Sequence, residues 1–138
     1  MVRPSTGTLI KSGGDTNQNL FYGSHFNLRV INDGTIRVDV GTVGLGYNNF
    51  GFENNGSIIA HAAVGQPKTT VWLLSNVTST GSIDADRVRF HGDHNSQIAD
   101  ITGSYRASVT DVNNVTVRIS GTILELGPLS IGGFGGLR

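Results

Sequence analysis

The sequence contains no cysteine, which excludes both a disulfide framework and thiolate chemistry. Charge is also scarce: charged residues make up 14% of the chain, against roughly 25% in ordinary soluble domains. Lys and Arg number 10, and Asp and Glu number 10, so the net charge is zero. Zero net charge without a basic block argues against nucleic-acid binding, and it favours association between protein molecules. We therefore expect a chain that packs against protein partners.

Long apolar runs are absent too. No segment approaches the ~20 apolar residues of a transmembrane helix, so membrane insertion is not expected. The first seven residues lack the apolar stretch of a signal peptide, and the missing cysteine staples favour an intracellular origin. The sequence thus predicts a protein that is made in the cytoplasm.

Helical periodicity is nearly absent as well. The 20 glycines divide the 138 residues into short segments in which apolar and polar residues alternate. This pattern predicts an all-β fold, an antiparallel β-sandwich of about 8–10 short strands, with jelly-roll and immunoglobulin-like topologies both compatible. Residues 1–129 would form one domain, and the glycine-rich residues 130–138 a tail that packs on the chain itself or on a neighbour. No repeat of fixed period stands out, which argues against a propeller or a solenoid.

The clearest alternation runs from Phe26 to Val40 and predicts a β-hairpin. With a three-residue loop at Asn32–Gly34, Val30 faces Ile36, and the apolar side chains of both strands share one face. Such a loop ends in a G1 bulge with Gly34 in the left-handed conformation. Gly34→Val should therefore damage folding.

Other segments give further strands. Alternation over Tyr105–Ile119, with turn residues at Asp111–Asn114, predicts a second hairpin. The segment Thr69–Ser75 around Trp72 is typical of a central strand covered on both faces. Arg87–His91 predicts a strand whose charged residues face outward.

One short segment has metal-ligand chemistry. His91, Asp93 and His94 could bring two imidazoles and a carboxylate to a zinc ion, which would make a small metal-dependent β-barrel enzyme one alternative. The spacing matches no strong ligand pattern, and no distant pair of His or Cys completes it. We favour a polar strand end followed by a turn, and we predict no cofactor.

No catalytic residues are identified. The sequence contains no Gly-x-Ser-x-Gly nucleophile elbow and no phosphate-binding Walker loop, and its only glutamates are Glu53 and Glu125. The chain is therefore predicted to be non-enzymatic.

A glycine- and asparagine-rich segment, Gly41–Gly56, is predicted to be a long loop with aromatic anchors. Aromatic rings beside amide side chains are suited to stacking on a sugar and bonding its hydroxyls, so a carbohydrate-binding module or lectin-like adhesin is an alternative function. The other interpretation is that the aromatic residues fold inward and hold the loop. The candidate glycan-binding residues are Tyr47, Asn48, Asn49, Phe50 and Phe52.

In composition the whole chain resembles the small virion structural proteins of tailed bacteriophages, namely minor tail, tail-tip, fibre and decoration proteins. It is short, free of cysteine, poor in lysine, and rich in Gly, Asn and Thr. The resemblance implies a structural protein of the virion that forms homo-oligomers, contacts other virion proteins and, in an adhesin, binds a glycan of the host surface. The glycine-rich tail would serve assembly through Phe134, Leu137 and Arg138.

Overall fold

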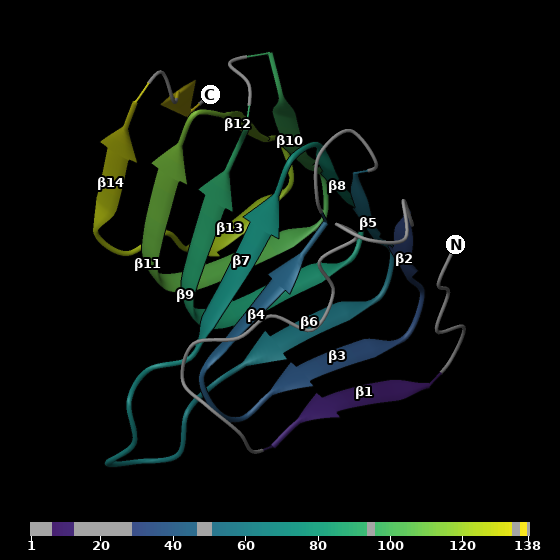
Figure 1. The fold of residues 1–138 in the computed structure, drawn as a ribbon, viewed down its shortest axis with the longest axis vertical. Helices are drawn as coiled ribbons and strands as arrows, with labels where there is room; N and C mark the ends of the chain where they lie inside the picture. The colour runs from purple at the N-terminus through teal and green to yellow at the C-terminus, as the bar shows by residue number, and fades with distance from the viewer. Residues whose placement is uncertain (1–6, 13–28, 47–50, 94–95, 134–135, 138) are drawn as a thin grey trace.

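The chain forms a parallel β-solenoid (Figure 1). The structure is a computed structural model that describes residues 7–12, 29–46, 51–93, 96–133 and 136–137. Every pairing between its strands is parallel, and the strands build one sheet of nine and one of six. The predicted all-β class is confirmed, whereas the antiparallel β-sandwich, jelly-roll or immunoglobulin-like, is wrong.

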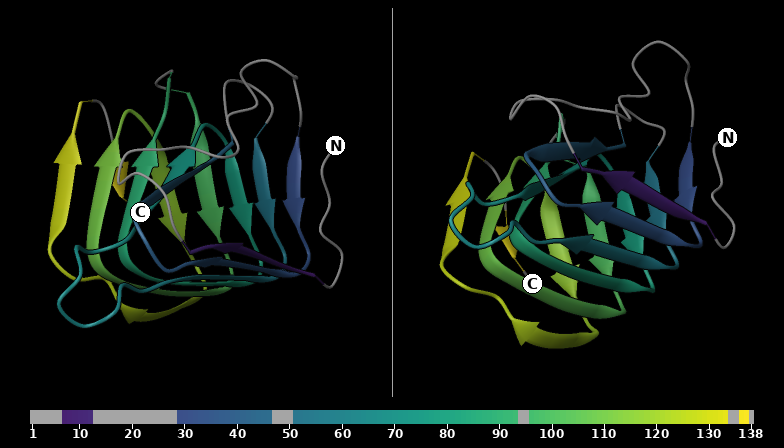
Figure 2. Two further views of the ribbon diagram at one scale, coloured as in Figure 1. Left: turned by 60° about the horizontal axis from the view of Figure 1, so that its bottom comes forward. Right: turned by 90° about the horizontal axis from the view of Figure 1, so that it is seen from below.

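Three faces surround the interior, and Figure 2 shows how the strands of each face stack side by side. Face A is the six-stranded sheet. It consists of β2 (Val30–Asn32), β5 (Phe52–Asn54), β8 (Val77–Ser79), β10 (Ile98–Ile101), β12 (Thr116–Ile119) and β15 (Gly136–Leu137).

The nine-stranded sheet bends into the other two faces, because β9 (Ser82–His91) and β11 (Ser104–Asn113) are long enough to contribute to both. Face B combines their first halves with β1 (Thr8–Lys11), β3 (Thr35–Val38), β6 (Ser57–Ala60) and β13 (Thr122–Glu125). Face C combines their second halves with β4 (Thr42–Leu45), β7 (Thr70–Leu74) and β14 (Leu129–Gly132).

A glycine precedes each face B strand, and these glycines stack into a ladder. The carbonyl oxygen of Gly56 accepts a hydrogen bond from the amide of Ser82 in the next turn, at 2.9 Å. A Cβ atom on Gly81 would lie 1.9 Å from that same oxygen, so a side chain cannot fit there. Stacking of successive turns at this corner therefore requires glycine. The glycines of the ladder are Gly7, Gly34, Gly56, Gly81, Gly103 and Gly121.

Beside the glycines, buried polar side chains form a second ladder at the ends of the first three face A strands. Asn32 donates from Nδ2 to Oδ1 of Asn54 at 2.7 Å, and Asn54 donates from Nδ2 to Oγ of Ser79 at 3.0 Å. Asn32 and Asn54 are 0% exposed. Ile101 and Ile119 end the next two face A strands, so the ladder becomes apolar toward the C-terminus.

The interior is filled by rows of apolar side chains that repeat from turn to turn. On face B, Ile36, Ile58, Ile83 and Tyr105 are in register. The ring of Tyr105 stacks on that of Phe90 with centroids 6.1 Å apart. The Tyr105 hydroxyl also contacts Oγ1 of a buried threonine on the same strand at 2.8 Å. Burial of this phenol raises its pKa far above the ordinary value.

The hairpin predicted from Phe26 to Val40 does not form. Val30 pairs with Phe52 and Ile36 pairs with Ile58, because β2 and β3 lie on different faces. Alternation separates inward from outward residues but does not reveal the direction of the neighbouring strand. Gly34 also lacks the positive φ of a G1 bulge.

The second predicted hairpin is wrong for the same reason. Tyr105 pairs with Ile83 and Ile123 on face B, whereas Val117 pairs with Ala99 on face A. The predicted long loop at Gly41–Gly56 contains β4 and β5, with its middle outside the described residues.

The prediction that no solenoid repeat exists was also wrong. The sequence pattern that recurs in each turn is a glycine followed by Ser or Thr. This pattern is too short to stand out in a chain that is rich in these residues. Successive ladder glycines are 27, 22, 25, 22 and 18 residues apart, so no fixed period marks the repeat. The projecting loop between β6 and β7, at the bottom of Figure 1, is one cause of this variation.

Candidate functional site

The outward side of face C carries two rows of side chains that cross the strands. The parallel register places equivalent positions of β7, β9, β11 and β14 side by side. The first row is Trp72, Arg89, Asp111 and Ser130. The second row includes His91, Asn113 and Gly132.

A groove of about 310 Å³ lies along these rows and is here named the face C groove. Gly132 supplies no side chain, and a Cβ placed on it would find its nearest neighbour, Oδ1 of Asn113, 3.9 Å away. The groove is therefore open where β14 crosses it. Its lining residues are Trp72, Arg89, His91, Asp111, Val112, Asn113, Ser130 and Gly132.

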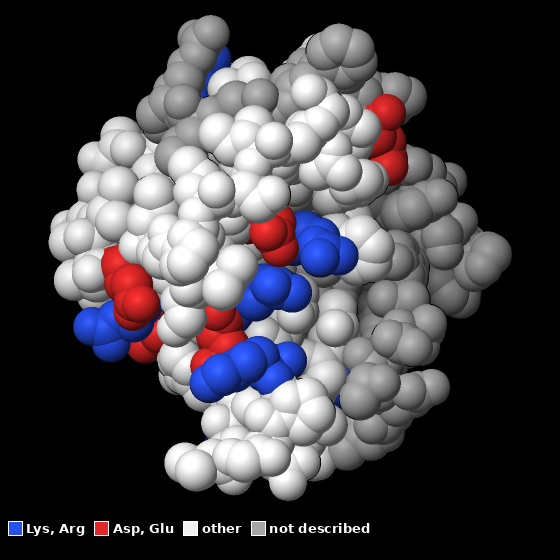
Figure 3. Space-filling model, turned by 90° about the vertical axis from the view of Figure 1, so that its left-hand side faces the viewer, with Lys and Arg blue, Asp and Glu red and all other residues white. Residues whose placement is uncertain are grey.

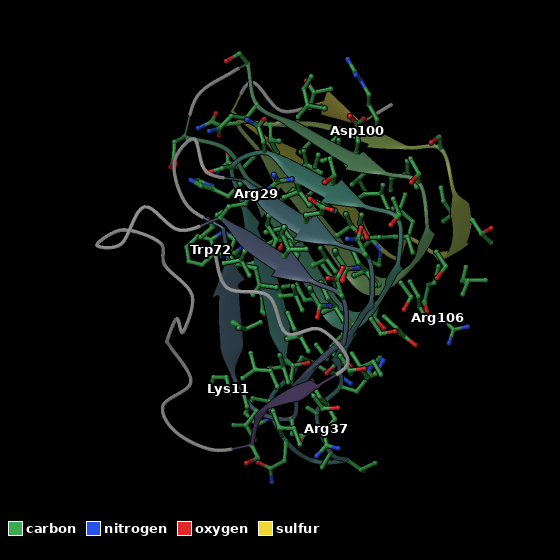
Figure 4. All side chains as sticks on the ribbon, turned by 90° about the vertical axis from the view of Figure 1, so that its right-hand side faces the viewer. Lys11, Arg29, Arg37, Trp72, Asp100 and Arg106 are labelled. Atoms are coloured by element: carbon green, nitrogen blue, oxygen red, sulfur yellow. The ribbon has the colours of Figure 1, made fainter. Side chains whose placement is uncertain are left out.

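Trp72, labelled in Figure 4, provides the aromatic surface of the groove. The guanidinium of Arg89 lies 5.6 Å from the centre of the indole ring, a cation–π contact. The ring of His91 meets the indole edge-on, with centroids 5.9 Å apart. The Nε1–H of Trp72 is buried and finds no acceptor among the described residues. The neighbouring side chains thus hold the indole in place without satisfying its polar atom.

Two arginines share one carboxylate in this region. Nε of Arg87 lies 3.5 Å and Nε of Arg89 3.6 Å from Oδ2 of Asp111. These three groups carry a local charge of +1. Mixed clusters of Lys or Arg with Asp or Glu are also visible on the face of the molecule shown in Figure 3.

A separate polar cluster lies where β9 bends from face B to face C. The ring of His61 contacts Oδ1 of Asp84 through Nε2 at 2.8 Å and Oδ1 of Asp86 through Nδ1 at 3.1 Å. Oδ2 of Asp86 accepts hydrogen bonds from the amides of Ala62 and Thr69, at 2.8 and 3.1 Å. One carboxylate therefore holds both ends of the loop between β6 and β7.

The pKa values in this cluster follow from these contacts. Partial burial of the His61 ring opposes its protonation, but the hydrogen bonds to Asp86 and Asp84 outweigh this effect and raise the pKa of His61. Burial of Asp86 favours its neutral form, but hydrogen bonds from the amides of Ala62 and Thr69 and from His61 lower the pKa of Asp86. The cluster therefore favours an imidazolium between two carboxylates, an arrangement that stabilises the loop.

The predicted glycan-binding residues are not brought into the face C groove by any described contact. Residues 47–50, including Tyr47, Asn48, Asn49 and Phe50, lie outside the described residues. Phe52 is 2% exposed and packs in the core, so the alternative interpretation, an inward-facing aromatic residue, applies to it. Phe52 is therefore not available to stack on a ligand.

The predicted metal-binding residues do not form one described cluster. His91 lines the face C groove, Asp93 is exposed beyond the end of β9, and His94 lies outside the described residues. In the part of the chain that the structure describes, no group of three or more His, Cys, Asp or Glu side chains is placed to hold a metal ion.

Of the three predicted assembly residues, the structure describes the backbone of Leu137. Phe134 and Arg138 lie outside the described residues, and the backbone of Leu137 pairs with that of Val117 in face A. Residues 129–132 form β14 on face C, so most of the predicted tail takes part in the two sheets.

Sequence reasoning missed the face C groove although it predicted several of its elements. It placed Trp72 in a strand and the side chains of Arg89 and His91 on an outward face. The missing information was the parallel register, which sets these residues beside Asp111 and Asn113, more than 20 positions away. Alignment of the glycines that precede Ser82 and Ser104 could have supplied it.

No family model, no curated protein and no solved structure matches the chain. Among the described residues, no helix is long and apolar enough to cross a membrane.

Proposed function

We propose that the chain is a non-enzymatic interaction protein that binds carbohydrate in the face C groove. The observation that carries this proposal is the row in which Trp72 lies beside Arg89, Asp111 and Ser130 across four strands. Strands in a sheet are about 4.8 Å apart, so this row extends over roughly 14 Å. That length accommodates more than one sugar ring.

The chemistry of the groove suits a polyol. A sugar hydroxyl both donates and accepts hydrogen bonds, and the groove offers an acceptor in Asp111, donors in Arg89, and groups of both kinds in Asn113 and Ser130. The indole of Trp72 offers an apolar surface to the C–H groups of a sugar ring. Because these groups project from paired strands, they are positioned before the ligand arrives, which lowers the entropic cost of binding.

The proposal of binding without catalysis rests on the acidic groups. Glycoside hydrolysis generally uses a pair of carboxylates on opposite sides of the bond that is broken. Among the described residues that line the groove, Asp111 is the one carboxylate, and two arginines neutralise it. The groove therefore has the groups for recognition of a sugar, and its described lining lacks the second carboxylate that glycoside hydrolysis generally uses.

Intrinsic fluorescence gives a direct test, because Trp72 is the single tryptophan of the chain. Oligosaccharides that are retained on a glycan array should shift or quench its emission in a saturable way. Gly132→Val should abolish the response by filling the groove, whereas Val64→Ala, in the exposed loop between β6 and β7, should leave it unchanged. If no oligosaccharide is retained and none changes the emission, the proposal is wrong.

A second candidate function is structural assembly with further copies of the chain, which the resemblance to virion proteins implies. Its observation is the apolar surface of the last described turn, where β13 and β14 carry four exposed large side chains. These are Ile123, Leu124, Leu129 and Ile131, which are 50%, 57%, 39% and 49% exposed. Contiguous exposed apolar surface commonly marks an interface.

At the opposite edge of face B, β1 also exposes apolar side chains, Leu9 and Ile10. A second copy could therefore add its β1 beside β13 and continue the parallel sheet head to tail. Light scattering over a range of concentrations should then show masses above the 14.6 kDa of one chain. Ile123→Lys should reduce them, whereas Val64→Lys, at a fully exposed site in the loop between β6 and β7, should not. A monomer at all concentrations would remove this candidate.

A further inference from the structure

We infer that the face C groove selects acidic carbohydrate, with the guanidinium of Arg89 as the group that recognises a carboxylate on the sugar. This inference rests on the proposed carbohydrate-binding function and specifies its ligand class. The first observation is the charge balance: Asp111 neutralises one of the two positive charges of Arg87 and Arg89, and the other remains uncompensated within this group of three residues.

The geometry leaves Arg89 available. Its Nε is 3.6 Å from Oδ2 of Asp111, which is an ion pair without a close hydrogen bond. Among the described residues, its contacts are this ion pair with Asp111 and the cation–π contact with Trp72. Arginine presents five N–H donors in a planar fork that matches a carboxylate in two parallel hydrogen bonds. A bound carboxylate would engage N–H donors that neither of these two contacts occupies with a close hydrogen bond.

The position of Arg89 is also fixed. Its guanidinium lies against the indole of Trp72, and Asp111 follows it in the same row. A sugar ring that packs against Trp72 would therefore bring its substituents to Arg89. Asp111 has a double role in this arrangement, because it orients Arg89 and repels a second anion.

The experiment compares two ligands that differ only at the carboxyl group of the sugar. The first is a tetrasaccharide that contains glucuronic acid, and the second is the same tetrasaccharide after reduction of its carboxylates to alcohols. Titration by calorimetry, with Trp72 emission as the second readout, should show the acidic form to bind about tenfold more tightly at low salt. Added NaCl should reduce this preference, because screening weakens the ion pair.

Variants assign the preference to Arg89. Arg89→Gln should bring the ratio of the two affinities, acidic form over reduced form, to about one when both are measured on the same variant. Asp111→Asn should increase the affinity for the acidic form, because it removes the competing carboxylate. Circular dichroism confirms that each variant folds, and Val64→Ala serves as the unchanged control.

The outcomes separate the two proposals. Equal binding of both tetrasaccharides, or an acidic preference that survives Arg89→Gln, would overturn the inference while the carbohydrate-binding function stands. If the reduced and acidic forms both fail to bind and other glycans also fail, the proposed function itself is wrong.

Discussion

Two regions of this solenoid share the same parallel register, but the register brings identical residues together in one region and different residues together in the other. At the corner between faces A and B, register stacks like on like: glycine on glycine, and asparagine on asparagine. On the outward side of face C, the same register sets unlike residues side by side, with Trp72, Arg89 and Asp111 in one row. The residues that repeat from turn to turn thus specify the fold, and the residues that differ from turn to turn form the groove.

We expect substitutions at the corner to reduce stability and to leave the groove chemistry intact. Substitutions in the groove should change ligand binding and leave the stability nearly unchanged. The ladder glycines directly precede β9 and β11, whereas the groove residues lie near the other ends of these long strands, so the corner and the groove can be altered separately.

The largest expected effect is at the glycine ladder. Gly81→Ala would place a methyl group 1.9 Å from the carbonyl oxygen of Gly56, so the two turns must separate. We expect a loss of about 3 kcal/mol in the free energy of unfolding and a Tm lower by roughly 10 °C. Gly7→Ala is the matched control, because a Cβ at Gly7 meets no atom within 4 Å. Equal Tm values for the two variants would contradict the ladder.

A smaller effect is expected at the asparagine ladder. Asn54→Leu keeps the branched shape of the side chain but removes the acceptor at 2.7 Å from Nδ2 of Asn32, which then retains the carbonyl oxygen of Ser57, and removes the donor to Oγ of Ser79. The free energy of unfolding should fall by about 2 kcal/mol, as measured by denaturant titration. Thr78→Leu, at the exposed outward position of β8, should change it by less than about 0.5 kcal/mol.

The His61 cluster should give a modest pH dependence. Because the folded-state pKa of His61 is raised, its contribution is full below the unfolded value of 6.5 and is lost as pH rises through the folded value. Asp86 has a lowered pKa, so its contribution is present above 3.8 and is lost as pH falls through its folded value. The His61 effect should stay below about 1 kcal/mol, since the ring is partly exposed and screened.

Urea titrations at a series of pH values measure both effects. His61→Gln should flatten the decline in stability on the alkaline side of 6.5 and also weaken the decline on the acid side, because the hydrogen bond from His61 helps to lower the pKa of Asp86. A decline of the same size in His61→Gln would show that another group is responsible.

The smallest effect on stability is expected in the groove. Gly132→Val adds a β-branched residue to β14 where there is room for it, so the free energy of unfolding should change by less than about 0.5 kcal/mol. Carbohydrate binding should nevertheless be lost. A marked fall in Tm would mean that Gly132 is needed for the fold and would weaken the contrast between the two regions.

Sequence patterns predicted the strands far better than their arrangement. In the predicted strand Arg87–His91, Val88 and Phe90 face inward, because the strand faces a core on one side. The strand around Trp72 was expected to be covered on both faces, but its outward side lines the face C groove. The same alternation arises in a sandwich and in a solenoid, and turn residues such as Asn32–Gly34 suit a hairpin as well as a corner. What distinguishes the two folds is which residue lies opposite Val30, and that depends on contacts 22 positions away.

The groove was harder still to predict, since it belongs to no single segment. Trp72 and Ser130 are separated by two other strands, and nothing local to either residue indicates that they share a row. The metal and lectin hypotheses both relied on residues close in sequence, such as His91 and Asp93. Within the part of the chain that the structure describes, these two residues belong to no group of candidate metal ligands.

The carboxylate of Asp86 has one further consequence, for the tolerance of the chain to insertion. It binds the amides of Ala62 and Thr69, so the two ends of the loop are held together independently of what lies between them. The tip of that loop, at Val64, is fully exposed and projects from the solenoid (Figure 1). A foreign peptide could therefore be displayed at this position with the register of β6 and β7 preserved, which would make the solenoid a scaffold for peptide display.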